Sequence, residues 1–148
     1  MLSGFVHLHT HSSYSPMQGV PSLEALCQTI RTQGHDTLAL TDTNGLYGAI
    51  RFLAVAREAG LKPVLGAELV HEHHRAVLLA KTPYGYANLC RILSARHTDD
   101  SFHFVNTVLH EAMTGVEFDA YAGAFEKYFG VKLSPPPVGF PVEFGVRH

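Results

Sequence analysis

Phe5-Val-His-Leu-His-Thr-His-Ser-Ser-Tyr-Ser15 places a histidine at every second position of its first half. Side chains two residues apart share one face of a β-strand, so His7, His9 and His11 project together from a strand predicted over residues 4–11. Imidazole nitrogen is a good ligand for zinc, manganese or iron, and two histidines separated by one residue can hold a single ion. The pattern predicts a divalent metal site at His9 and His11. His7 is either a further ligand or a residue packed in the interior.

Strand and helix signals alternate through residues 1–97, which is typical of parallel βα units in an α/β fold. The helix ends support this assignment, because Pro21-Ser22 is a typical helix start, Gly34 follows the first predicted helix and Gly60 follows the second. We predict strands over residues 4–11, 37–42, 62–70 and 75–81, and helices over residues 22–33, 48–59 and 83–97.

Polar side chains stand at the carboxyl ends of three predicted strands, where β/α barrels gather their active sites. His9 and His11 end the first strand, Asp42 ends the second, and Glu68 lies near the end of the third. A carboxylate in an apolar stretch such as that before Glu68 is costly unless it is exposed, paired or bound to metal. We therefore expect Glu68 to be a metal ligand, or else a solvated strand end. Asp42 is a candidate catalytic residue, or else a turn former.

The composition limits the classes of protein to which the chain can belong, but it does not identify a function. With 148 residues, 46% of them hydrophobic and 16% charged, the chain suits one compact domain or a piece of one. No apolar run is long enough to cross a bilayer and the start lacks the pattern of a signal peptide, so a cytoplasmic protein is expected. The net charge of −2 gives no broad basic surface for nucleic acid. Cys27 and Cys90 lack the spacing of a zinc pair and are expected to be buried thiols.

The composition changes near Thr98. Seven of the nine phenylalanines follow residue 101, and residues 98–148 hold seven acidic against three basic side chains. Helices are predicted over residues 102–113 and 117–129, followed by a proline-rich extended tail. This divergent carboxyl-terminal segment is either part of the fold or an unrelated continuation produced by a frameshift or a gene-fragment junction.

Four ordered motifs resemble a known family, the polymerase-and-histidinol-phosphatase (PHP) domain, over residues 1 to about 97. The likeness is to the amino-terminal PHP domain of the bacterial DNA polymerase III alpha subunit, and most of all to the error-prone alpha-type polymerases. The motifs are His9-Thr-His-Ser-Ser-Tyr-Ser15, Leu38-Ala-Leu-Thr-Asp-Thr-Asn-Gly-Leu-Tyr-Gly48, Gly60-Leu-Lys-Pro-Val-Leu-Gly-Ala-Glu68, and Val77-Leu-Leu-Ala-Lys81 with Gly85-Tyr-Ala-Asn-Leu-Cys-Arg91.

The resemblance implies a partial or distorted β/α (TIM-like) barrel that, in active members, binds up to three metal ions and hydrolyses phosphoester bonds. In some polymerases this activity is a 3′ to 5′ exonuclease. Position by position, His9 and His11 match the histidine ligands and Glu68 matches the acidic ligand. The implied partners are other polymerase domains or subunits, with DNA contacted indirectly and no membrane. The chain cannot polymerise DNA by itself, because polymerisation needs several further domains.

The chain departs from the family at three positions. It has Gln18 where active members carry aspartate or histidine, Thr43 where a histidine often follows Thr-Asp, and Arg75 where another histidine ligand often precedes the fourth strand. His74 is adjacent, but a shift of one residue in a strand reverses the side-chain direction. The late Asp-x-His ligands have no match in residues 98–148. A partial metal centre, or none, is therefore expected.

Two functions follow from these residues. The first is a truncated or divergent PHP domain of the polymerase lineage, linked to replication or translesion synthesis, with weak or no phosphoesterase activity. The alternative is a stand-alone metal-dependent phosphatase or phosphodiesterase of the histidinol-phosphatase type. The further cluster His71-Glu-His-His74 falls between two predicted strands, where a solvated loop is the simpler interpretation.

Overall fold

The computed structural model describes residues 5–113, which form a small sheet and four helices within the described range. The chain divides into two compact units, Met1–Leu93 and Ser94–His148. The predicted boundary near Thr98 stays a prediction, and the predicted helix over residues 117–129 lies outside the described residues. The elements are α1 (Leu23–Thr32), β1 (Thr37–Leu40), α2 (Ala49–Glu58), β2 (Lys62–His71), β3 (His74–Leu79), α3 (Pro83–Thr98) and α4 (Phe104–Met113).

The sheet has the order β1-β2-β3 and is mixed. β1 and β2 are parallel, with Thr37 opposite Lys62, and α2 connects them as the sequence predicts for a βα unit. The parallel arrangement does not extend to β3, which pairs antiparallel with β2 from Gly66↔Leu79 to His71↔His74. A two-residue turn joins β2 to β3, and a parallel crossover needs a much longer connection. The α/β class is confirmed, while the described strands form an open sheet.

The histidine-rich segment runs beside β1 without forming the continuous strand predicted over residues 4–11. Its described part makes one isolated parallel bridge, between His7 and Leu38. The backbone N–H groups of Ala39 and Thr41 donate to the carbonyls of His7 and Thr10, and the Thr10 hydroxyl donates to the Ala39 carbonyl. A bend at His9 interrupts the regular alternation of side chains.

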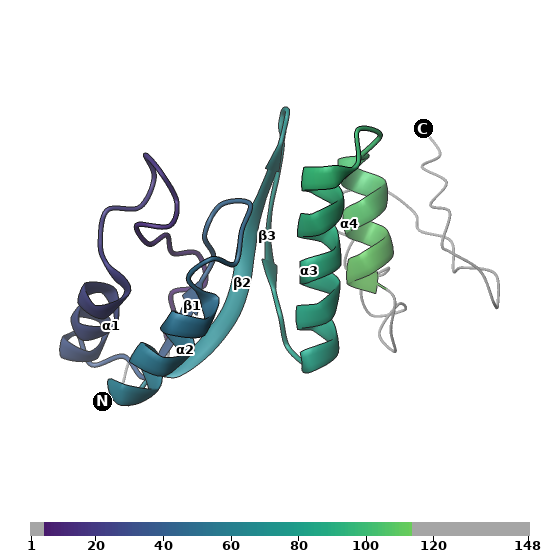
Figure 1. Cartoon of the computed structure of the whole chain (residues 1–148). Helices are drawn as coiled ribbons and strands as arrows, with labels where there is room; N and C mark the ends of the chain where they lie inside the picture. The colour runs from purple at the N-terminus through teal and green to yellow at the C-terminus, as the bar shows by residue number, and fades with distance from the viewer. Residues whose placement is uncertain (1–4, 114–148) are drawn as a thin grey trace. The chain divides into compact units, whose positions relative to one another are not determined.

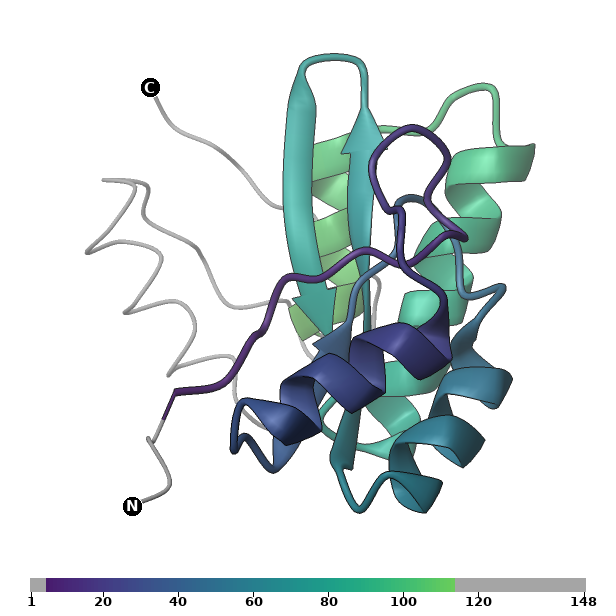
Figure 2. The ribbon, with the colours of Figure 1, turned by 90° about the vertical axis from the view of Figure 1, so that its left-hand side faces the viewer.

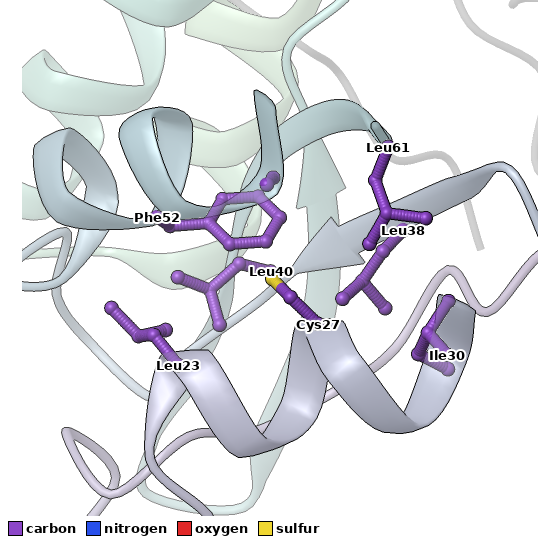
Figure 3. Close-up of a cluster of buried hydrophobic side chains, with 8 residues drawn as sticks. Leu23, Cys27, Ile30, Leu38, Leu40, Phe52 and Leu61 are labelled. Carbon is purple, nitrogen blue, oxygen red and sulfur yellow. The ribbon is translucent and has the colours of Figure 1, made fainter. Parts of the chain in front are cut away.

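Helices α1 and α2 cover one face of the sheet (Figures 1 and 2). The Ser22 hydroxyl caps α1 by accepting from the Ala25 N–H, as the predicted helix start requires. Between the two helices and β1 lies the hydrophobic core drawn in Figure 3, made of Leu23, Cys27, Ile30, Leu38, Leu40, Phe52, Ala56 and Leu61.

Both cysteines are free thiols. Cys27 is fully buried in the core, and this burial raises the pKa of its thiol, which keeps it protonated and unreactive. Cys90, on α3, is only partly buried. Among the described residues, no helix combines the length and apolar character that a membrane span requires.

Phe52→Ala should lower the free energy of unfolding by about 3–5 kcal/mol, because it empties the volume of a fully buried aromatic ring at the centre of the core. Ile50→Ala, in the same helix at a side chain that is 73% exposed, is the matched control and should change stability by about 0.5 kcal/mol or less. Urea unfolding followed by circular dichroism measures both. Equal losses for the two variants would contradict the assigned core.

Candidate metal centre

Two segments of the chain meet at the carboxyl end of the parallel strands, one carrying His9 and His11 and the other carrying Glu68. His9, His11 and Glu68 each offer one ligand atom, and these atoms lie within 4.8 Å of one another. The Nε2 atom of His9 is 3.4 Å from Oε1 of Glu68, and the Nε2 atom of His11 is 3.1 Å from Oε2. The two imidazole rings are nearly perpendicular, with centroids 4.9 Å apart. The structure thus brings together three of the residues that the sequence singled out, although their role as ligands stays a prediction.

Glu68 is fixed in position by the loop that follows β1. Its backbone N–H donates to the Asp42 carbonyl over 3.1 Å, and its carbonyl accepts from the Asn44 N–H over 2.8 Å. The Thr43 hydroxyl lies 3.1 Å from Oε2 of the carboxylate. The side chain is 0% exposed, so the alternative of a solvated strand end is wrong. A carboxylate buried this deeply requires compensating partners.

Two buried polar atoms in this cluster lack hydrogen bonds. They are Nε2 of His11 and Oε1 of Glu68. Oε1 has close contacts with His9 and with Arg75, but neither has hydrogen-bond geometry. Leaving a buried polar atom unsatisfied costs about 1–3 kcal/mol, so atoms of this kind mark a site where a ligand is missing or strain is stored. Two imidazoles with one glutamate form a donor set found in catalytic zinc sites, so these residues fit a divalent ion.

Asp42 holds the loop that carries His11. Its Oδ1 atom accepts from the Ser12 N–H over 2.7 Å and from the Ser15 hydroxyl over 2.6 Å, and its Oδ2 atom accepts from the Ser12 hydroxyl over 2.7 Å. The Ser15 oxygen in turn accepts from the Thr43 N–H over 2.9 Å. All of these side chains except Thr43 are buried. Asp42 therefore joins the histidine segment to the end of β1, and its catalytic role stays a prediction.

Ser12 and Ser15 belong to the hydrogen-bond network of the site, although sequence reasoning assigned them no role. The signal was present in the motif that begins at His9, where both serines stand at fixed positions. The loop closes tightly behind them, with the Gly19 N–H donating to the Ser15 carbonyl over 2.9 Å. A Cβ atom at Gly19 would lie 1.9 Å from the Ser12 carbonyl oxygen, so only glycine fits there.

The three departures from the family pattern all lie around Glu68. The Thr43 hydroxyl is 3.1 Å from both Oε1 of Gln18 and Oε2 of Glu68, and its single proton can be donated to only one of them at a time. The Nε atom of Arg75 approaches Oε1 of Glu68 at 3.3 Å. One glutamate carboxylate thus interacts with a hydroxyl and a guanidinium of this chain as well as with two histidines.

His7 is not brought into the group. Its ring packs edge-on against Phe5 and against His35, with centroids 4.8 Å and 5.4 Å away. The bend at His9 is the reason, because the rule that places alternate residues on one face holds only for a continuous strand. The cluster at residues 71–74 lies at the tip of the β2–β3 hairpin, where the loop interpretation holds for the exposed Glu72, at φ 52°, and His73 only. His71 and His74 are instead the paired end residues of β2 and β3.

The chain matches known proteins in two ways, through a family model and through similarity to bacterial DNA polymerases. Residues 7–139 match the family model described as the PHP domain. The error-prone DNA polymerase of Symbiobacterium thermophilum is 47% identical over 94 residues, which cover 63% of this chain and 9% of that polymerase. The DNA polymerase III subunit alpha of Treponema pallidum is 32% identical over 114 residues, covering 67% of this chain and 10% of that subunit. The chain therefore spans 9–10% of the length of these relatives.

A solved structure with a partial likeness is an amidohydrolase from Chromobacterium violaceum with bound sulfate and no metal. The TM-score is 0.46 at 18% identity, over 95% of this chain and 60% of that one.

Asp42→Ala should lower the free energy of unfolding by about 3 kcal/mol or more, because it leaves three donors without their acceptor in a buried site. Amide hydrogen exchange at residues 12–19 should accelerate with it. Asp99→Ala is the control, since Asp99 accepts from the N–H and hydroxyl of Ser101 at an exposed position and should change stability little. Unchanged exchange at residues 12–19 in Asp42→Ala would contradict the assigned role.

Proposed function

Because the chain belongs to the PHP domain family, we propose that it is the PHP portion of a polymerase of the DNA polymerase III alpha lineage, of the error-prone type. Its own phosphoesterase activity is weak or absent, and it serves DNA replication or translesion synthesis as a structural support. Its partners are the other polymerase domains or subunits, it contacts DNA only through them, and it works in the cytoplasm, where bacterial DNA is replicated.

The observation that supports this proposal most strongly is that side chains of the protein itself contact both carboxylate oxygens of Glu68. Thr43 reaches one carboxylate oxygen and Arg75 the other. Neither side chain is a usual metal ligand, and a guanidinium repels a cation that approaches the same oxygen. The amide of Gln18, which faces Thr43, is likewise a poor ligand for a transition metal.

His9, His11 and Glu68 are the residues that would hold a divalent ion such as zinc, manganese or iron. Such an ion, when bound, activates water and neutralises phosphate charge. The contribution of the protein is to aim the two imidazoles at Glu68. Asp42, whose two oxygens already accept three hydrogen bonds, acts in this proposal by positioning His11 rather than by transferring a proton.

A second candidate function is a stand-alone metal-dependent phosphatase or phosphodiesterase of the histidinol-phosphatase type. The unsatisfied Nε2 of His11 and Oε1 of Glu68 favour it, because a bound ion would satisfy both atoms. This candidate requires Arg75 to turn away from Glu68 when metal binds.

Elemental analysis of the purified chain and hydrolysis of bis(p-nitrophenyl) phosphate with manganese or zinc separate the two functions. We expect less than one metal ion per chain, and hydrolysis in the wild type no faster than in His9→Ala. His73→Ala, at the exposed tip of the hairpin, controls for the loss of any imidazole. Stoichiometric metal with turnover that His9→Ala abolishes and His73→Ala retains would establish the phosphatase instead.

A further inference from the structure

We propose that Arg75 is a tethered cation that competes with a divalent metal ion for Glu68 and thereby sets the metal affinity of the centre. This inference deepens the proposed function and rests on it, since it concerns the same cluster of side chains. It assigns to one residue of this chain a regulatory role at that cluster.

The contacts of the two carboxylate oxygens differ in a way that points to Arg75. Oε2 lies 3.1 Å from both the Thr43 hydroxyl and the His11 imidazole. Oε1 has no hydrogen bond, and it is this oxygen that the Arg75 Nε approaches at 3.3 Å and the His9 Nε2 at 3.4 Å. The guanidinium therefore stands beside the carboxylate oxygen that remains available to an ion.

The strand register explains why Arg75 reaches Glu68. Glu68 pairs with Val77 across the hairpin, and Arg75 stands two residues before Val77 on the same face of β3. Such diagonal neighbours lie within reach of long side chains. The adjacent His74 belongs to the opposite face, so it cannot take the place of Arg75. The two-residue turn of the hairpin fixes this register.

The two partners differ in burial, which makes the guanidinium displaceable. The Glu68 side chain is 0% exposed, whereas that of Arg75 is 61% exposed. Arginine keeps its charge at any ordinary pH, so the buried carboxylate has a cationic neighbour whether or not metal is present. An incoming ion must overcome the repulsion of that charge or move it into solvent, where most of the Arg75 side chain already lies.

The test is the affinity of the full chain for Mn²⁺ and Zn²⁺, measured by isothermal titration calorimetry. Arg75→Gln removes the charge without adding an imidazole. This variant should bind metal at least about tenfold more tightly than the wild type. Arg75→Lys keeps a cation and should stay near the wild-type affinity. The matched control is Arg51→Gln, which removes an exposed arginine paired with Glu24 and should leave the affinity unchanged.

The double variant Arg75→Gln with Glu68→Gln tests whether the gain in metal affinity depends on Glu68. It should bind metal no more tightly than the wild type. An Arg75→Gln chain that binds no more tightly than the wild type, or a gain that survives Glu68→Gln, would overturn the competition. These outcomes are distinct from a failure of the proposed function, which is overturned by stoichiometric metal in the wild type together with turnover that His9→Ala abolishes. Rapid hydrolysis by the wild type would not alter the comparison of affinities.

Discussion

The burial of the Glu68 carboxylate is the constraint on which the rest of the site depends. A charge removed from water must be matched by cations or donors, or it destabilises the fold. This chain surrounds Glu68 with His9, His11, Thr43 and Arg75, each within 3.4 Å of a carboxylate oxygen. The extension of β2 beyond the end of β1 places Glu68 where all four can meet it, because residues of the loop after β1 pair with it there.

The residues that hold the site in position differ from those that contact the Glu68 carboxylate. Asp42, Ser12 and Ser15 form a buried network that ties the histidine segment to the sheet, while the β2–β3 hairpin brings a guanidinium to the same carboxylate. A metal centre needs the network that orders the histidine segment. In our proposal, the guanidinium on the hairpin opposes metal binding. The chain thus keeps three side chains that fit a divalent ion, while the Arg75 guanidinium stands beside the same carboxylate. In the proposed function, this chain is a structural part of a much longer polymerase.

Sequence reasoning located His9, His11 and Glu68 because strand ends on one edge of a sheet converge, and that rule does not depend on exact strand boundaries. It failed for His7, since a bend breaks the alternation on which the expectation depended. The antiparallel direction of β3 was not predicted, although the four residues between the predicted strands over 62–70 and 75–81 are too few for a parallel crossover. The roles of Ser12 and Ser15 depend on contacts with a residue about 30 positions away, which the local pattern does not contain.

We propose that the cation beside Glu68 is the Arg75 guanidinium rather than a metal ion. A crystal structure of the chain purified without chelators, with anomalous scattering recorded at the zinc, iron and manganese edges, tests this most directly. We expect no fully occupied anomalous peak between His9, His11 and Glu68, and electron density for the Arg75 guanidinium beside the carboxylate. A fully occupied ion bound by all three side chains, with Arg75 turned into solvent, would contradict it.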